Sequence, residues 1–237
     1  MQMERTGSVS MNQTDGRVIE LDVRVETDEV LRMMGCGKEG KLRPEHRALV
    51  ETLIEHSASA IRARGTYAVY PVTRMTDTEL VLAQCPPIRG PIAGFLKPAT
   101  RVAAFVTTVG DDIERMADER LRKGARLEGY ILNAIGSAAA DAAVDALADI
   151  IYFEDANPEE ALTPPFSPGY CGLSLDEQIS LFAMVNTRPL GVKLLPTMIM
   201  QPLKSVSGLI GIGPSNQVEA HGVPCQWCDL TTCHMRR

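Results

Sequence analysis

The chain has 237 residues, with 24 basic and 30 acidic side chains and a formal net charge of −6 at pH 7. Apolar residues make up 45% and charged residues 23%, which is typical of a globular protein and excludes a disordered or fibrous chain. The acidic balance and the 5% aromatic content argue against nucleic-acid binding, because phosphate backbones are held by basic surfaces and bases stack on aromatic rings.

Export and membrane insertion are not indicated either. Residues 1–16 are polar, lack the apolar core of a secretory signal, and are predicted to be a disordered leader. The most apolar long stretch, 130–153, is interrupted by three aspartates that would be costly in a bilayer. We therefore expect a cytoplasmic protein without a membrane partner, whose six cysteines stay reduced or bind metal.

The first half of the chain mixes strand and helix patterns. Strict alternation at the end of 18–25 is typical of a strand. Pro44 favours a helix start and Gly65 a helix end. The predicted elements are a strand at 18–25, helices at 28–34 and 44–64, strands at 67–72 and 80–84, and a turn-rich section at 86–98.

The middle of the chain predicts a buried strand at 101–108, a helix from 111 to 123 and a long alanine-rich helix at 127–151. Five polar residues recur every four positions on the long helix and share one face: Asn133, Ser137, Asp141, Asp145 and Asp149. This stripe is either an acidic face for a metal or other cation, or a solvated face on a helix that packs through alanines. We favour the solvated face.

The last third begins with a proline-rich loop at 156–172, a length that is usual for functional or disordered loops. Ser174 predicts a capped helix reaching 185, and strands are predicted at 191–195, 198–200 and 203–212. The groups of strands and helices favour an α+β class: a single domain with a twisted antiparallel sheet and flanking helices. The predicted division is 17–215 for this domain and 216–237 for a cysteine-rich tail.

The tail holds a candidate metal site. Cys225 and Cys228 form a CxxC turn, Cys233 could supply a third thiolate, and His221 or His234 could complete a tetrahedral zinc site. Three thiolates could instead hold an iron–sulfur cluster. A tail of reduced thiols and a CxxC redox pair are the alternatives.

Four segments in order carry a resemblance to a known family. They are Ser167-Pro168-Gly169-Tyr170, a helix with Leu175, Glu177, Gln178 and Leu181-Phe182, then Gly191-Val192-Lys193-Leu194, and finally 201–208, QPLKSVSG. Together they resemble the reactivation domain of cobalamin-dependent methionine synthase in its stand-alone bacterial form. The resemblance spans about residues 17–237.

The resemblance implies a domain that binds S-adenosylmethionine and docks on a corrinoid-carrying methyltransferase protein. An electron donor such as flavodoxin or ferredoxin and the bound methyl donor then restore methylcobalamin, in support of methionine biosynthesis. Carried onto this chain, it implies that Tyr170 faces the corrinoid or the adenosyl ligand and acts at the reaction centre. The implied ligand-binding residues are Ser167, Pro168, Gly169, Tyr170 and Lys204.

One departure from the family pattern concerns the ligand carboxylate. The family's loop begins with an arginine four residues before the glycine, and this chain has Pro165 there. Lys193 and Lys204 are the nearest downstream cations.

Because the arginine is absent, a protein of another class is also considered: a docking or electron-delivery module whose cysteine tail holds zinc or an iron–sulfur cluster. A third reading is a scaffold whose tail is a structural zinc knot, and iron content separates these last two.

Overall fold

The structure is a computed structural model. It describes residues 17–36, 43–170 and 172–221. The expected leader at 1–16 and the candidate ligands Cys225, Cys228, Cys233 and His234 lie outside these ranges. Among the described residues, no helix is both long and apolar enough to cross a membrane.

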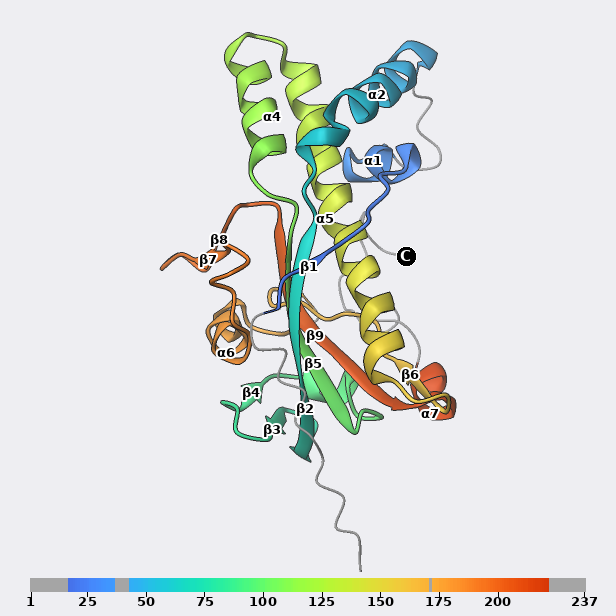
Figure 1. The fold of residues 1–237 in the computed structure, drawn as a ribbon, viewed down its shortest axis with the longest axis vertical. Coiled ribbons are helices and arrows are strands. Elements are labelled where there is room, and N and C mark those ends of the chain that lie inside the picture. Colours follow the sequence, from blue (N-terminus) through green and yellow to red (C-terminus); the bar gives the residue numbers. More distant parts are fainter. Residues whose placement is uncertain (1–16, 37–42, 171, 222–237) are drawn as a thin grey trace, which may run out of the picture.

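An antiparallel sheet of seven strands forms the centre of the fold (Figure 1). Its strands lie in the order β4-β3-β2-β5-β9-β6, and β1 pairs separately with β2. The three long central strands pair over their whole shared length, from Arg64↔Thr108 to Pro71↔Arg101 and from Thr108↔Ser205 to Arg101↔Ile212. The strand bounds are β1 Ile19–Glu20, β2 Arg64–Met75, β3 Glu79–Leu82, β4 Ile88–Arg89, β5 Arg101–Thr108, β6 Glu160–Leu162 and β9 Ser205–Pro214.

One face of the sheet is covered by the long helix α5 (Arg126–Asp155). Ala103 and Phe105 of β5 and Ile210 of β9 belong to its hydrophobic core, all fully buried. The alanines of α5 let the helix lie close to the strands, since small side chains shorten the distance between packed elements. The same core takes in α1 (Thr27–Met33), α2 (Pro44–Ser57), η1 (Ala58–Ala60) and α4 (Asp112–Arg122).

Shorter elements cover the opposite face. There Val102 and Ala104 of β5 belong to a second core, with Leu181 and Met184 of α6 and with Phe166. This face carries α3 (Ile92–Phe95), η2 (Leu175–Glu177), α6 (Gln178–Met184) and the separate hairpin of β7 (Lys193–Leu194) and β8 (Met200–Gln201).

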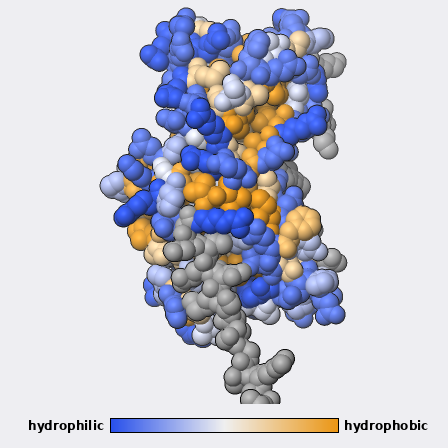
Figure 2. Space-filling view, viewed as in Figure 1, coloured by the Kyte–Doolittle hydropathy of each residue, from blue (hydrophilic) through white to orange (hydrophobic). Residues whose placement is uncertain are grey.

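The space-filling view, from the same side as Figure 1, shows apolar surface gathered in the middle of the molecule, with hydrophilic residues around it (Figure 2).

The α+β class with an antiparallel sheet is confirmed, and the strand at 101–108 matches its prediction residue for residue. Several predictions were wrong. The loop expected at 156–172 contains β6, and the strands expected at 191–195 and 203–212 are Lys193–Leu194 and Ser205–Pro214. Two further differences lie in the first half of the chain. The strand at 18–25 shrinks to Ile19–Glu20, because only these residues pair with β2. The helix predicted to reach residue 64 ends at Ser57, and Arg64 instead begins the strand that pairs with Thr108.

The end of the described chain continues past the boundary expected at 215/216. A last helix, α7 (Ser215–His221), follows β9 directly and contacts both β6 and β9. Val218 is 5% exposed, so this helix packs on the body of the domain.

Candidate functional site

The candidate site begins where the proline-rich loop joins the sheet. Phe166 and Leu209 exchange two backbone hydrogen bonds, with N–O distances of 2.9 and 2.8 Å. Gly208 permits this close pairing, because a β-carbon there would lie 2.6 Å from the Phe166 carbonyl oxygen and 2.9 Å from the Phe105 ring. The sheet therefore fixes the residue that directly precedes Ser167.

Ser167–Tyr170, together with Gly172 and Leu173, then form a tight turn whose backbone groups hydrogen-bond to one another. Gly169 has a φ of +90°, a conformation that glycine adopts without strain. Its N–H donates to the Leu173 carbonyl at 2.8 Å, and the Tyr170 N–H donates to the Ser167 carbonyl at 3.2 Å. Pro168 is buried while Tyr170 is 70% exposed. The turn thus presents an aromatic ring to solvent from a rigid backbone.

A second segment, residues 88–95, packs directly against this turn. A β-carbon on Gly90 would lie 3.2 Å from the Gly172 carbonyl oxygen, and one on Gly172 would lie 2.6 Å from Pro91. The rings of Phe95 and Phe166 stack with centroids 5.5 Å apart. Sequence reasoning treated 86–98 only as turns, and the Gly90-Pro91 pair was the local sign of a close backbone contact.

Exposed aliphatic side chains continue from the tyrosine along the next helices. Leu175 is 43% and Ile179 57% exposed, and the Leu175 side chain lies 3.7 Å from where a Gly169 β-carbon would be. Leu175 begins η2 and Ile179 lies on α6 directly after it. We call the exposed side chains of Tyr170, Leu175 and Ile179 the apolar rim beside the turn.

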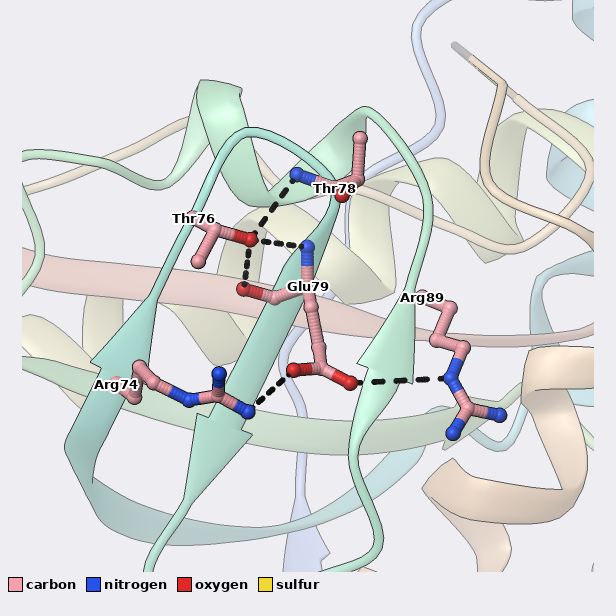
Figure 3. Close-up of polar contacts among 5 residues, drawn as sticks. All are labelled: Arg74, Thr76, Thr78, Glu79 and Arg89. Atoms are coloured by element: carbon pink, nitrogen blue, oxygen red, sulfur yellow. Dashed lines mark hydrogen bonds and ion pairs between the residues drawn. The ribbon is translucent and has the colours of Figure 1, made fainter.

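A group of charges lies on β2, β3 and β4, next to the segment that supports the turn (Figure 3). Glu79 accepts a hydrogen bond from Arg74 at 2.5 Å. Its other carboxylate oxygen lies 3.8 Å from Nε of Arg89, beyond hydrogen-bonding distance. Thr76 Oγ1 accepts from the Glu79 N–H at 3.0 Å and fixes the hairpin.

Lys204, expected at the ligand, lies elsewhere. Its Nζ donates to Ser137 Oγ on α5 at 2.8 Å, and its side chain lies over Gly136, where a β-carbon would be 3.1 Å from Lys204 Cε. Burial lowers the pKa of the Lys204 ammonium below its ordinary 10.5, while the nearby charge of Glu114 partly opposes this. The structure therefore places the amine in the α5 core, across the sheet from the turn, and does not bring it together with Ser167, Pro168, Gly169 and Tyr170.

The polar stripe on α5 is partly engaged with other elements. Ser137 accepts from Lys204, and Asp141 lies 3.5 Å from Arg32 of α1. In the part of the chain that the structure describes, no three His, Cys, Asp or Glu side chains form a group that could hold a metal ion. His221 ends α7, and its metal role stays a prediction together with those of the three tail cysteines.

Comparison with known proteins is informative at the level of the fold. No protein-family model and no curated protein matches the sequence. The structure is similar to one described as the crystal structure of the MetH reactivation domain bound to AdoHcy, with 15% sequence identity and a TM-score of 0.62. The match covers 84% of this chain and 78% of that chain. The resemblance predicted from the sequence is thus confirmed for the fold.

Proposed function

We propose that the turn formed by 167–170 with Gly172 and Leu173 binds S-adenosylmethionine and presents its methyl group to the corrinoid of a separate methyltransferase protein. The observation that carries this proposal is the exposed Tyr170 on a rigid glycine turn, in a chain with the fold of a domain solved with AdoHcy. S-adenosylhomocysteine (AdoHcy) is what remains of the methyl donor once its methyl group has left.

The turn has the chemistry that such a ligand requires. The Tyr170 ring offers a flat apolar surface for adenine or for the face of a corrinoid, and aromatic stacking of bases is worth about 1–3 kcal/mol. The backbone at Gly169 carries no side chain, so a ligand can approach it closely. When bound, the methyl donor supplies a sulfonium-linked methyl group. The role of the protein is to orient that group and to cover the reacting atoms.

The apolar rim beside the turn fits the docking step. Tyr170, Leu175 and Ile179 are exposed apolar side chains on adjoining elements, and contiguous apolar surface marks interaction sites. A corrinoid-carrying partner that covers this rim would also close the ligand site from water. A one-electron donor such as flavodoxin or ferredoxin would act on that complex.

Calorimetric titration with S-adenosylmethionine tests the binding step. We expect binding by the wild-type protein in the micromolar range and a loss of at least tenfold in Tyr170→Ala. Tyr152→Ala is the matched control, because Tyr152 is an exposed tyrosine on α5. Equal affinities in all three proteins would exclude the turn as the site, and no binding by the wild type at millimolar ligand would exclude the proposed function.

The docking and electron-delivery module remains the second candidate, and Pro165 favours it. That exposed proline stands where the related loop has the arginine that pairs with the ligand carboxylate. In this case Cys225, Cys228 and Cys233 would hold an iron–sulfur cluster or zinc. Iron and zinc analysis of anaerobically purified protein, beside a Cys225→Ser variant, tests it: stoichiometric metal lost in the variant supports the module, and metal-free protein contradicts it.

A further inference from the structure

One side of α4 carries charges of alternating sign. Asp112, Arg115, Glu119 and Arg122 are separated by three, four and three positions, and residues at these spacings lie on one face of a helix. The two buried residues of α4 lie on its other face. The four charges, here called the charged row of α4, therefore point away from the core, on a helix that stands at one end of the molecule (Figure 1).

The order of the signs is symmetric about Ala117. Asp112 and Arg122 lie five positions before and after it, and Arg115 and Glu119 lie two positions before and after it. Each of these two pairs joins an acid and a base. If two copies of α4 lie side by side in opposite directions and level at Ala117, every carboxylate of one copy therefore lies opposite an arginine of the other. A two-fold dimer uses the same patch on both subunits, and such a patch must be complementary to itself.

The surface beside the charged row is hollowed. A groove of about 410 Å³ lies between η1 and α4, and its walls are the charged row together with Met116, Ser59 and Ala60. The two residues of η1 in this wall have small side chains. Long side chains of a second helix could therefore enter the groove beside α4.

The ion pairs that the charged row makes in a single subunit are surface contacts. They are all local to one chain: Asp112 with Arg62 and Arg115, and Glu119 with Lys123. In the part of the chain that the structure describes, Arg122 has no ion pair. Exposed ion pairs contribute little by themselves, so these charges can turn to a partner at small cost.

We propose that α4 is an interface between two copies of this chain, paired in opposite directions about a two-fold axis level with Ala117. Asp112 then lies opposite Arg122 of the partner subunit, and Arg115 lies opposite Glu119 of the partner subunit. The charges of the row balance, which does not suit a partner of one sign such as nucleic acid.

The size of the interface sets the expected strength. A helix of 11 residues offers little area compared with the roughly 1,200–2,000 Å² of stable complexes, so we expect a dimer that dissociates on dilution. The charged row belongs to the α5 side of the sheet, whereas the turn that carries Tyr170 packs on the other side. The dimer and the proposed function therefore stand or fall separately.

Reversing charges across the axis tests this arrangement by sedimentation equilibrium. We expect the wild type to exceed its monomer mass of 25.8 kDa at hundreds of micromolar. It should return to that mass on dilution or in about 1 M salt, where the Debye length is only about 3 Å. Arg115→Glu and Glu119→Arg each place like charges opposite one another and should raise the dissociation constant about tenfold or more. The double variant restores opposite charges and should dimerise like the wild type.

Arg24→Glu is the matched control. It changes the net charge as Arg115→Glu does, at a side chain that is 89% exposed and lies outside the charged row. Weakening by both single variants, with recovery in the double variant and no change in Arg24→Glu, supports the proposal. A wild type that stays monomeric at millimolar concentration overturns it. So does a dimer that neither single variant weakens, a loss that the double variant does not reverse, or an equal loss in Arg24→Glu.

Discussion

The two faces of the sheet are built in different ways. On one, the single 30-residue helix α5 has thirteen buried residues, and eleven of them belong to a core shared with α1, α2 and α4. On the other, short pieces such as η2 and the seven-residue α6 cover the strands and leave Tyr170, Leu175 and Ile179 exposed. The first face buries the larger core, and the second offers the surface that a ligand or partner can reach.

The side chains of Lys204 and Arg89 differ in burial and bonding in the same way as the two faces. Lys204 is buried, hydrogen-bonded to Ser137 and packed over Gly136 of α5. Arg89 is exposed, and its ion pair with Glu79 is long. A buried and bonded amine contributes to the fold, whereas an exposed guanidinium in a long ion pair contributes little to stability.

The largest expected effect is on the α5 face. Ile135→Ala removes a fully buried side chain of α5 and should lower the free energy of unfolding by about 2–5 kcal/mol, the usual cost of such a cavity. Ile179→Ala on the opposite face is the matched control, because Ile179 is 57% exposed and should cost within about 0.5 kcal/mol. Urea unfolding measures both, and equal losses would contradict the contrast between the faces.

Gly208→Ala acts at the junction between the sheet and the turn. Its new methyl group would meet the Phe166 carbonyl and the Phe105 ring, so we expect a loss of about 1–3 kcal/mol from overpacking. Because Phe166 precedes the turn, the same variant should also weaken S-adenosylmethionine binding. Thermal unfolding and calorimetry check the two effects, and unchanged values for both would show that the junction does not hold the turn.

The variant Lys204→Met tests how the buried ammonium of Lys204 affects the free energy of unfolding as the pH changes. Folding lowers the pKa of Lys204 below its ordinary 10.5. Between the pKa of the folded state and that of the unfolded state, the unfolded chain binds more protons than the folded one. The stability of the wild type therefore rises with pH over this interval. The methionine variant lacks this slope and should differ from the wild type at pH 7 by about 1 kcal/mol or less. Urea unfolding from pH 7 to 10.5 measures it, and parallel profiles would contradict the lowered pKa.

The smallest expected effect on stability is that of Tyr170→Ala. The ring is exposed, so the free energy of unfolding should change by less than about 0.5 kcal/mol while ligand binding is lost. A clear drop in stability would mean that Tyr170 supports the turn, and its binding phenotype would then have a structural cause.

The sequence predicted those elements that local patterns determine. The apolar run at 101–108 and the alanine-rich stretch predicted β5 and α5. Each depends on residues close in the chain. The fold class followed from their order.

Features that depend on distant contacts were missed. The strand β6 is short and exists because Glu160–Leu162 pair with β9, about fifty residues later. The packing of 88–95 against the turn joins segments about eighty residues apart. Lys204 adjoins a strand of the site in sequence, but its side chain enters the α5 core, and no local pattern indicates which face it takes.

The position of the bound ligand tests the central claim most directly. A crystal structure of the protein with AdoHcy would show it. The account predicts the adenosyl group against the Tyr170 ring and the backbone of Gly169, at the turn supported by residues 88–95. Density for AdoHcy on the α5 stripe, or anywhere away from Tyr170, would contradict it.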